Sequence, residues 1–164
     1  MGFLQAVSAQ DIAETAYSSH GLSGKLFLFT ARLLHCQESM ALLTDSLTEK
    51  VIGCLIAVHR AIGPGLFESV YEKCVGLEFE ANGIRHVRQV PLTLIYRGQP
   101  IRSVYRVDFV IENRLLVELK AIDRMLPVHQ SQMLTYLKLS GLRQGLLVNF
   151  NVPKLVDGLK SFLR

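Results

Sequence analysis

The chain lacks any long apolar run. None of its runs approaches the roughly 20 residues that a membrane helix needs, and the most apolar early stretch, residues 26–34, is interrupted by Thr30 and Arg32. The N-terminus also lacks a basic start followed by an apolar core, so we expect no secretory signal. The sequence therefore predicts a protein without a membrane partner.

Cysteine is scarce as well. Cys36, Cys54 and Cys74 are odd in number, lie far apart and match no zinc-binding spacing. An intracellular protein with reduced thiols, located in the cytoplasm, is the better interpretation. Cys54 and Cys74 fall in helical patterns, where a buried structural thiol is the favoured role.

Acidic residues are missing from residues 81–107, where Tyr96 and Tyr105 lie among five arginines. These arginines are Arg85, Arg88, Arg97, Arg102 and Arg106. The net charge is −4 over residues 1–80, from 5 basic and 9 acidic residues, and +8 over residues 81–164, from 13 and 5. A basic face of this kind suits a polyanion such as nucleic acid. The solvated outer face of a β-hairpin explains the pattern equally well.

The length and composition predict one globular domain with a substantial core, because the chain has 164 residues, 49% of them hydrophobic. Residues 1–43 show no clean period, and we interpret them as an N-terminal extension with a helix at 26–43. Met40, just before the first well-formed helical pattern, is a candidate start of the protein. The domain itself is expected over residues 44–164.

Hydrophobic spacing predicts the element order ααβββαβα. The helices are expected from residue 44 to the Gly63-Pro64-Gly65 break, then at 67–81, 128–140 and 153–164, and the strands at 86–98, 101–111, 115–121 and 145–150, the first two joined by Gly98-Gln99-Pro100. Three consecutive strands indicate an antiparallel meander, and the third helix then crosses over to a fourth strand. The expected fold class is α/β, with a mixed four-stranded sheet flanked by helices.

Within the hairpin expected at residues 105–121, the charged residues Asp108, Glu118 and Lys120 interrupt the apolar runs of the two strands. If the loop is 112–114, with Asn113 left-handed, then opposed residues have numbers that sum to 226. Asp108 then lies opposite Glu118, and side-chain alternation puts Lys120 on the same face. The other face is expected to be apolar throughout: Val107, Phe109, Ile111, Leu115, Val117, Leu119 and Ala121.

The two opposed carboxylates predict a site for a hard divalent cation. Carboxylates on adjacent strands repel each other unless a cation lies between them, and Mg²⁺ takes oxygen ligands while keeping several waters. Lys120 could orient or deprotonate a water, or stabilise charge on a phosphate. The alternative is an exposed sheet face on which Asp–Lys and Glu–Arg pairs form, and E-x-K alone favours that alternative.

Two helical segments add polar residues beside their core-facing stripes. Glu68 and Tyr71 are three residues apart, and Gln132 and Tyr136 are four apart, so each pair shares a helical face. Polar side chains placed in this way usually point toward a common site, which weakens the alternative of an exposed sheet face with simple ion pairs. For either tyrosine alone, a core-edge residue with a solvated hydroxyl is the simpler interpretation.

The pattern Gly65-x-x-Glu68-x-x-Tyr71 resembles the signature of the GxxExxY proteins. Together with Asp108 and Glu118-x-Lys120, it makes residues 47–164 similar to the PD-(D/E)xK nuclease superfamily, in particular to its RecB-like and exonuclease-like members. This resemblance implies a restriction-endonuclease-like αβββαβ core. Val107 departs from the motif, which has proline at that position.

The resemblance also implies catalytic roles. Asp108 and Glu118 would be metal ligands, with the backbone carbonyl of Leu119 often completing the shell, and Lys120 would be the catalytic lysine. Glu68 would be a further catalytic glutamate, contacting the metal directly or through water. Gln132-x-x-x-Tyr136 is similar to the element that supports the site and the nucleic-acid backbone in RecB-like nucleases.

The predicted function is a nuclease that depends on Mg²⁺, with Mn²⁺ as a substitute, and hydrolyses nucleic acid, DNA being favoured. The expected supporting or nucleic-acid-binding residues are Gln132, Tyr136, Tyr71, Arg106 and Arg102. The alternative is a catalytically silent nucleic-acid-binding or protein-interaction module on the same fold. A homodimer, or a place in a larger complex, stays open.

Overall fold

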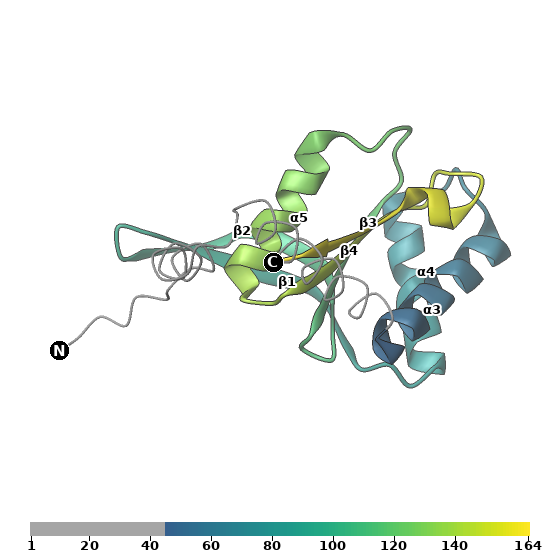
Figure 1. Ribbon diagram of the computed structural model, residues 1–164, viewed down its shortest axis with the longest axis horizontal. Coiled ribbons are helices and arrows are strands. Elements are labelled where there is room, and N and C mark those ends of the chain that lie inside the picture. The colour runs from purple at the N-terminus through teal and green to yellow at the C-terminus, as the bar shows by residue number, and fades with distance from the viewer. Residues whose placement is uncertain (1–44) are drawn as a thin grey trace, which may run out of the picture. The chain divides into compact units, whose positions relative to one another are not determined.

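The computed structural model describes residues 45–164, which form a mixed five-stranded sheet with helices on both faces (Figure 1). The elements are α3 (Ser46–Ile62), α4 (Glu68–Ala81), β1 (His86–Tyr96), β2 (Gln99–Ile111), β3 (Leu115–Lys120), α5 (Pro127–Ser140), β4 (Gln144–Asn149), the 3₁₀ helix η1 (Leu155–Gly158) and β5 (Leu159–Leu163). The predicted α/β class is confirmed. Within this described part, no helix has the length and apolarity to cross a membrane. The helix predicted at 26–43 lies outside the described residues.

The sheet has the order β1-β2-β3-β4-β5. Strands β1, β2 and β3 pair antiparallel in sequence, and β3 pairs with β4 in parallel, because α5 carries the chain across the sheet between them. The predicted meander and crossover are therefore confirmed. The turn between β1 and β2 is Arg97-Gly98, with φ values of 49° and 75°, rather than the predicted 98–100. Two left-handed residues in succession make the tight turn that matches the twist of a hairpin.

The register between β2 and β3 confirms the predicted sum of 226. Phe109 pairs with Val117, and Ile111 pairs with Leu115. The loop at 112–114 holds two left-handed residues rather than one, since both Glu112 and Asn113 have positive φ angles, 49° and 53°. This register sets which side chains of the two strands meet.

The helices divide the core into two clusters, one on each face of the sheet (Figure 1). On one face, α3 and α4 pack against Phe109, Val117 and their neighbours. On the other, α5 packs Met133 and Leu137 against Leu116 and Leu147 of the central strands. Both faces are thus buried at the sheet centre, which is why β3 and β4 are apolar along most of their length.

The predicted C-terminal helix at 153–164 is wrong, because that segment forms η1 and the fifth strand. Strand β5 pairs antiparallel with β4, from Leu159–Val148 to Leu163–Gln144. Strand β4 is fully buried, so an unpaired outer edge would leave its backbone groups without partners. Gly158 makes the close approach possible, because a Cβ there would lie 2.3 Å from the carbonyl oxygen of Asn149.

Candidate active site

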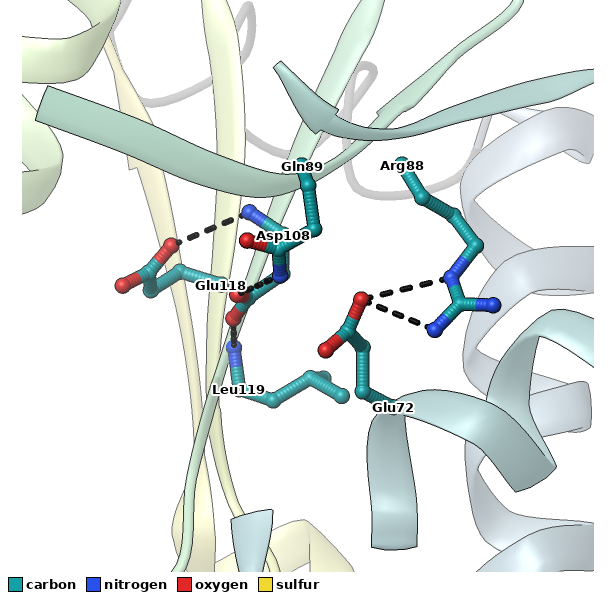
Figure 2. Close-up of polar contacts among 6 residues, drawn as sticks. All are labelled: Glu72, Arg88, Gln89, Asp108, Glu118 and Leu119. Carbon is teal, nitrogen blue, oxygen red and sulfur yellow. Dashed lines mark hydrogen bonds and ion pairs between the residues drawn. The ribbon is translucent and has the colours of Figure 1, made fainter. Parts of the chain in front are cut away.

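Asp108 lies where the β2–β3 ladder ends. Backbone pairing stops at Phe109–Val117, and beyond it the two carboxylates bond to the opposite strand. Oδ2 of Asp108 accepts a hydrogen bond from the Leu119 N–H at 2.8 Å, and Oε2 of Glu118 accepts one from the Asp108 N–H at 3.5 Å (Figure 2). Side chains thereby replace the backbone ladder, and this exchange brings the two carboxylates together.

The apolar face predicted for the hairpin is wrong at one position, Val107. This residue packs into the cluster under α5, whereas Phe109 belongs to the cluster under α3 and α4. Residues two apart share a face in a regular strand, so the alternation breaks at Asp108. The break coincides with Gln89 on β1, which falls opposite Asp108 in the register and has a φ of 52°.

Lys120 completes the charged cluster. Its Nζ lies 2.6 Å from Oε1 of Glu118, and both side chains are largely buried. Burial lowers the pKa of Lys120, but the negative charges of Glu118, Glu68 and Asp108 outweigh burial and raise the pKa overall. The amine is therefore an ammonium ion at neutral pH.

Burial and mutual repulsion act on both carboxylates. Glu118 is 4% exposed, and burial together with the charge of Asp108 raises its pKa to about 7. Burial also raises the pKa of Asp108, although the hydrogen bond from Leu119 and the charge of Lys120 act against this. The environment disfavours two negative charges side by side, so a cation placed between them would be stabilised.

The donor set suits a cation that keeps part of its water shell. Among residues 45–164, no group of three or more histidine, cysteine, aspartate or glutamate side chains lies close enough to hold an ion. The two carboxylates of Asp108 and Glu118 are enough for Mg²⁺, because this ion is commonly bound through one or two carboxylates and several waters.

Glu68 is the first residue of α4, and the structure brings its charge near the pair. Its negative charge raises the pKa of Asp108 and of Lys120, although Glu68 forms no hydrogen bond with either within the described residues. Figure 2 shows Glu72, one turn further along α4, beside Asp108 and paired with Arg88. The start of α4 thus adds negative charge to one side of the site.

Tyr71 is not brought into the cluster, because it is fully buried in the core. Its hydroxyl donates to the Gly63 carbonyl at 2.7 Å and accepts from the Leu66 N–H at 3.2 Å. Gly65, in the same turn, has a φ of 94°, which a residue with a side chain rarely adopts. Gly65 and Tyr71 together shape the turn that places Glu68 at the start of α4.

Gln132 and Tyr136 lie on α5, on the other side of the pair. The amide of Gln132 donates to the Tyr136 hydroxyl. Burial, and then the charge of Glu118, raise the pKa of Tyr136 to about 12, so the hydroxyl stays protonated at neutral pH. The ring of Tyr105 contacts the ring of Tyr136, with centroids 5.6 Å apart. The structure therefore brings this helical pair beside Glu118.

Arg102 and Arg106 lie exposed on β2. Within residues 45–164 neither forms an ion pair, whereas Arg85 pairs with Glu112 at 2.5 Å and Arg88 pairs with Glu72 at 3.0 Å. The predicted basic face is thus partly neutralised near the body of the sheet and free of acids further along the hairpin.

Two residues near Asp108 were not predicted from the sequence. The Gln89 amide donates to Oδ1 of Asp108 at 3.2 Å, and the charge of Glu72 contributes to the raised pKa of Asp108. Glu72 could have been found, because it is one helical turn after Glu68. Gln89 gave no signal, since it lies within an ordinary strand pattern.

A family model described as the PD-(D/E)XK nuclease superfamily matches residues 45–162, and the chain belongs to this superfamily. The predicted resemblance at this level is confirmed. Nucleases of the superfamily generally use divalent metals. Searches of curated proteins and of solved structures found no match.

Proposed function

We propose that the protein is a Mg²⁺-dependent nuclease, in which Mn²⁺ can replace Mg²⁺, and that it hydrolyses phosphodiester bonds of nucleic acid, with DNA as the favoured substrate. One observation carries the proposal. Two neighbouring carboxylates, the partly buried Asp108 and the buried Glu118, accept backbone hydrogen bonds from Leu119 and Asp108 respectively, and the ammonium group of Lys120 pairs with Glu118. Such a cluster is unfavourable without a cation and is suited to binding one.

Each residue of the cluster has a role in this proposal. Asp108 and Glu118 hold the ion, and Glu68 adds negative charge from α4. When bound, the ion supplies Lewis-acid activation for the attack of water on phosphorus. Lys120 orients the attacking water or stabilises charge on the phosphate. Tyr136, protonated at neutral pH, offers a hydrogen-bond donor beside Glu118.

The β1–β2 hairpin supports a nucleic-acid substrate. Its turn end extends away from the helices (Figure 1) and carries Arg97 and Arg102, and Arg106 lies further along β2, opposite Pro91. None of the three is paired with an acid in the described part of the chain. Tyr96, which lies under the Arg97 guanidinium, is 60% exposed. Unpaired arginines beside exposed aromatic rings suit phosphates and bases.

Within the superfamily we place the protein among the GxxExxY proteins. Support comes from the way the motif residues act together, since Gly65 and Tyr71 form the turn that sets the position of Glu68. A cytoplasmic location fits the free thiols of Cys54 and Cys74, and burial raises the pKa of Cys54, which keeps that thiol unreactive.

A catalytically silent binding module on the same fold is the second candidate. It is favoured by exposed apolar side chains near the turn of the hairpin, among them Ile95, Ile101 and Val104. Apolar residues gathered at a surface indicate contact with a partner. That partner could be bound whether or not the carboxylates hold an ion.

The test is a cleavage assay on labelled linear, circular and single-stranded DNA and on RNA, with Mg²⁺, Mn²⁺ or EDTA. We expect metal-dependent cleavage of at least one substrate, lost in Asp108→Ala and Lys120→Ala but kept in the matched control Asp157→Ala, which alters an exposed acid of η1. Full activity in Asp108→Ala would contradict the assignment. Binding without cleavage, in every metal, would favour the silent module.

A further inference from the structure

We propose that Gln89 is a positioning residue that fixes the Asp108 carboxylate in the orientation needed to hold the metal ion. The inference rests on the proposed function, because it concerns the same site. Gln89 lies on β1, which contributes no carboxylate to the cluster. Its amide nevertheless contacts Oδ1 of Asp108 at 3.2 Å.

The carboxylate of Asp108 is held from two sides. Leu119 on β3 donates its backbone N–H to Oδ2 at 2.8 Å, and Gln89 on β1 donates its side-chain amide to Oδ1. One donor alone would leave the carboxylate free to rotate about its bond to Cβ. Two donors from opposite neighbouring strands fix its plane, and each oxygen keeps a lone pair for a cation.

The backbone of Gln89 supports a dedicated role. Its φ of 52° lies in the left-handed region, which residues other than glycine, asparagine and aspartate seldom adopt. The β1–β2 ladder pairs Arg88 with Phe109 and Val90 with Val107 but skips the position between them. In this conformation the Gln89 side chain reaches Asp108, which occupies the skipped position on β2.

The chemistry of the amide also fits. An arginine or lysine at this position would neutralise Asp108 and compete with a cation, and an acid would add repulsion, whereas an amide donates without adding charge. The neighbouring cation, Arg88, is directed elsewhere. Its Nε and Nη2 bond to Oε1 of Glu72 at 3.2 and 3.0 Å, and Figure 2 shows this pair separate from the Gln89–Asp108 contact.

The experiment compares Gln89→Gly with the wild type and with the matched control Gln99→Gly, which removes an exposed glutamine at the far end of the hairpin. Glycine suits the left-handed backbone, so the variant removes the amide without straining the fold. We expect circular dichroism spectra like the wild type. Mn²⁺ affinity, measured by calorimetry, should fall about 10- to 100-fold, as is typical when a group that orients a metal ligand is removed.

A split between kinetic constants separates positioning from other roles. In Gln89→Gly, kcat at a fixed Mg²⁺ concentration below saturation should fall and KM for nucleic acid should stay unchanged, because Gln89 orients Asp108 rather than contacting substrate. Gln89→Asn, which restores a shorter amide, should recover part of the Mn²⁺ affinity.

Wild-type Mn²⁺ affinity in Gln89→Gly, or a raised KM with unchanged kcat, would overturn the positioning role while leaving the nuclease proposal intact. Absence of both Mn²⁺ binding and cleavage in the wild-type protein would overturn the two proposals together.

Discussion

At the scale of single residues, the site is defined by like charges that are buried together. Glu118 and Asp108 both have raised pKa values, with burial as the largest cause, although Lys120 lies 2.6 Å from Glu118. One ammonium ion does not offset the burial of two carboxylates. This imbalance is the physical basis for expecting a further cation in the cluster.

The first prediction concerns pH in metal-free buffer. The folded-state pKa of Glu118, about 7, lies above its ordinary value of 4.5, so the folded protein holds this proton more tightly than the unfolded chain. The stabilisation is full below about pH 4.5 and is lost as the pH rises through 7. The free energy of unfolding should therefore fall by up to about 3 kcal/mol over this range.

Urea denaturation in EDTA at several pH values measures this effect. Glu118→Gln, which cannot titrate, serves as the control and should show a clearly shallower slope. An equal slope in the variant and the wild type would show that another group governs the pH dependence.

The positions of individual site residues could be predicted only where the strand that holds them has regular β conformation. The alternation of β3 and the register of 226 were enough to place Asp108, Glu118 and Lys120 together from the sequence alone. Gln89 was not predictable, because no residue type in that stretch signals a left-handed residue inside a strand. Val107 was misplaced for the same reason.

At the scale of elements, the turn before α4 and the last strand are held by specific close contacts. In the turn, a buried tyrosine hydroxyl bonds two backbone groups of the loop that precedes Glu68. At the end of η1, just before the last strand, the buried Gly158 lets the chain pass against the end of β4. Each of these two arrangements can be tested by a single substitution.

The second prediction is that Tyr71→Phe destabilises the fold by about 1–3 kcal/mol, since the Gly63 carbonyl and the Leu66 N–H lose their partner. Chemical denaturation measures the loss. Tyr96→Phe is the matched control, because its ring is exposed, and it should change stability by less than about 0.5 kcal/mol. Equal effects of the two variants would mean that the Tyr71 hydroxyl does not hold the turn.

The third prediction concerns Gly158→Ala. A Cβ at this position would meet the Asn149 carbonyl oxygen at 2.3 Å and a methyl carbon of Val152 at 3.0 Å, so β5 must shift. We expect a loss of about 1–3 kcal/mol. Gly53→Ala is the control, because Gly53 lies within α3 with no atom within 4 Å of an added Cβ. It should stabilise the protein by about 0.5–1 kcal/mol.

Thermal melting of both glycine variants gives the comparison. A melting temperature of Gly158→Ala at or above the wild-type value would contradict the close packing of the chain against the end of β4.

Element types followed from the sequence where the pattern was long, and failed at the C-terminus. Helices α3, α4 and α5 and the strands of the meander lie within a few residues of their predicted bounds. The segment 153–164 has an apolar spacing compatible with a helix, but it is short, and the need of β4 for an edge partner decides its structure. The spacing of apolar residues within a segment does not show whether a distant strand needs that segment as a pairing partner.

At the scale of the whole molecule, charge is separated between the hairpin and the cluster. Three arginines without acid partners in residues 45–164 lie on the β1–β2 hairpin, namely Arg97, Arg102 and Arg106, while Glu68 and Glu72 at the start of α4 add negative charge beside Asp108 on the central strands. This separation follows the imbalance visible in the sequence, where the second half carries most of the basic residues. The meander and crossover that create it were also predictable from element order.

The fourth prediction concerns salt. If Arg102 and Arg106 contact phosphates of duplex DNA, each replacement by alanine should reduce the slope of log affinity against log salt concentration by about 0.9. Fluorescence anisotropy with a labelled duplex in EDTA measures binding without cleavage. Arg114→Ala is the control, because Arg114 pairs with Asp45 at 3.1 Å, and its slope should match the wild type. If the slope is unchanged in both hairpin variants, then the nucleic acid binds to another face of the protein.

The most direct test of the central claim is the melting temperature with and without Mn²⁺, measured for the wild type and for Glu118→Ala. An ion that binds only the folded state raises the melting temperature by mass action. The carboxylate pair predicts a concentration-dependent rise in the wild type that is absent from the variant. No rise in the wild type, or the same rise in Glu118→Ala, would contradict a metal site at Asp108 and Glu118.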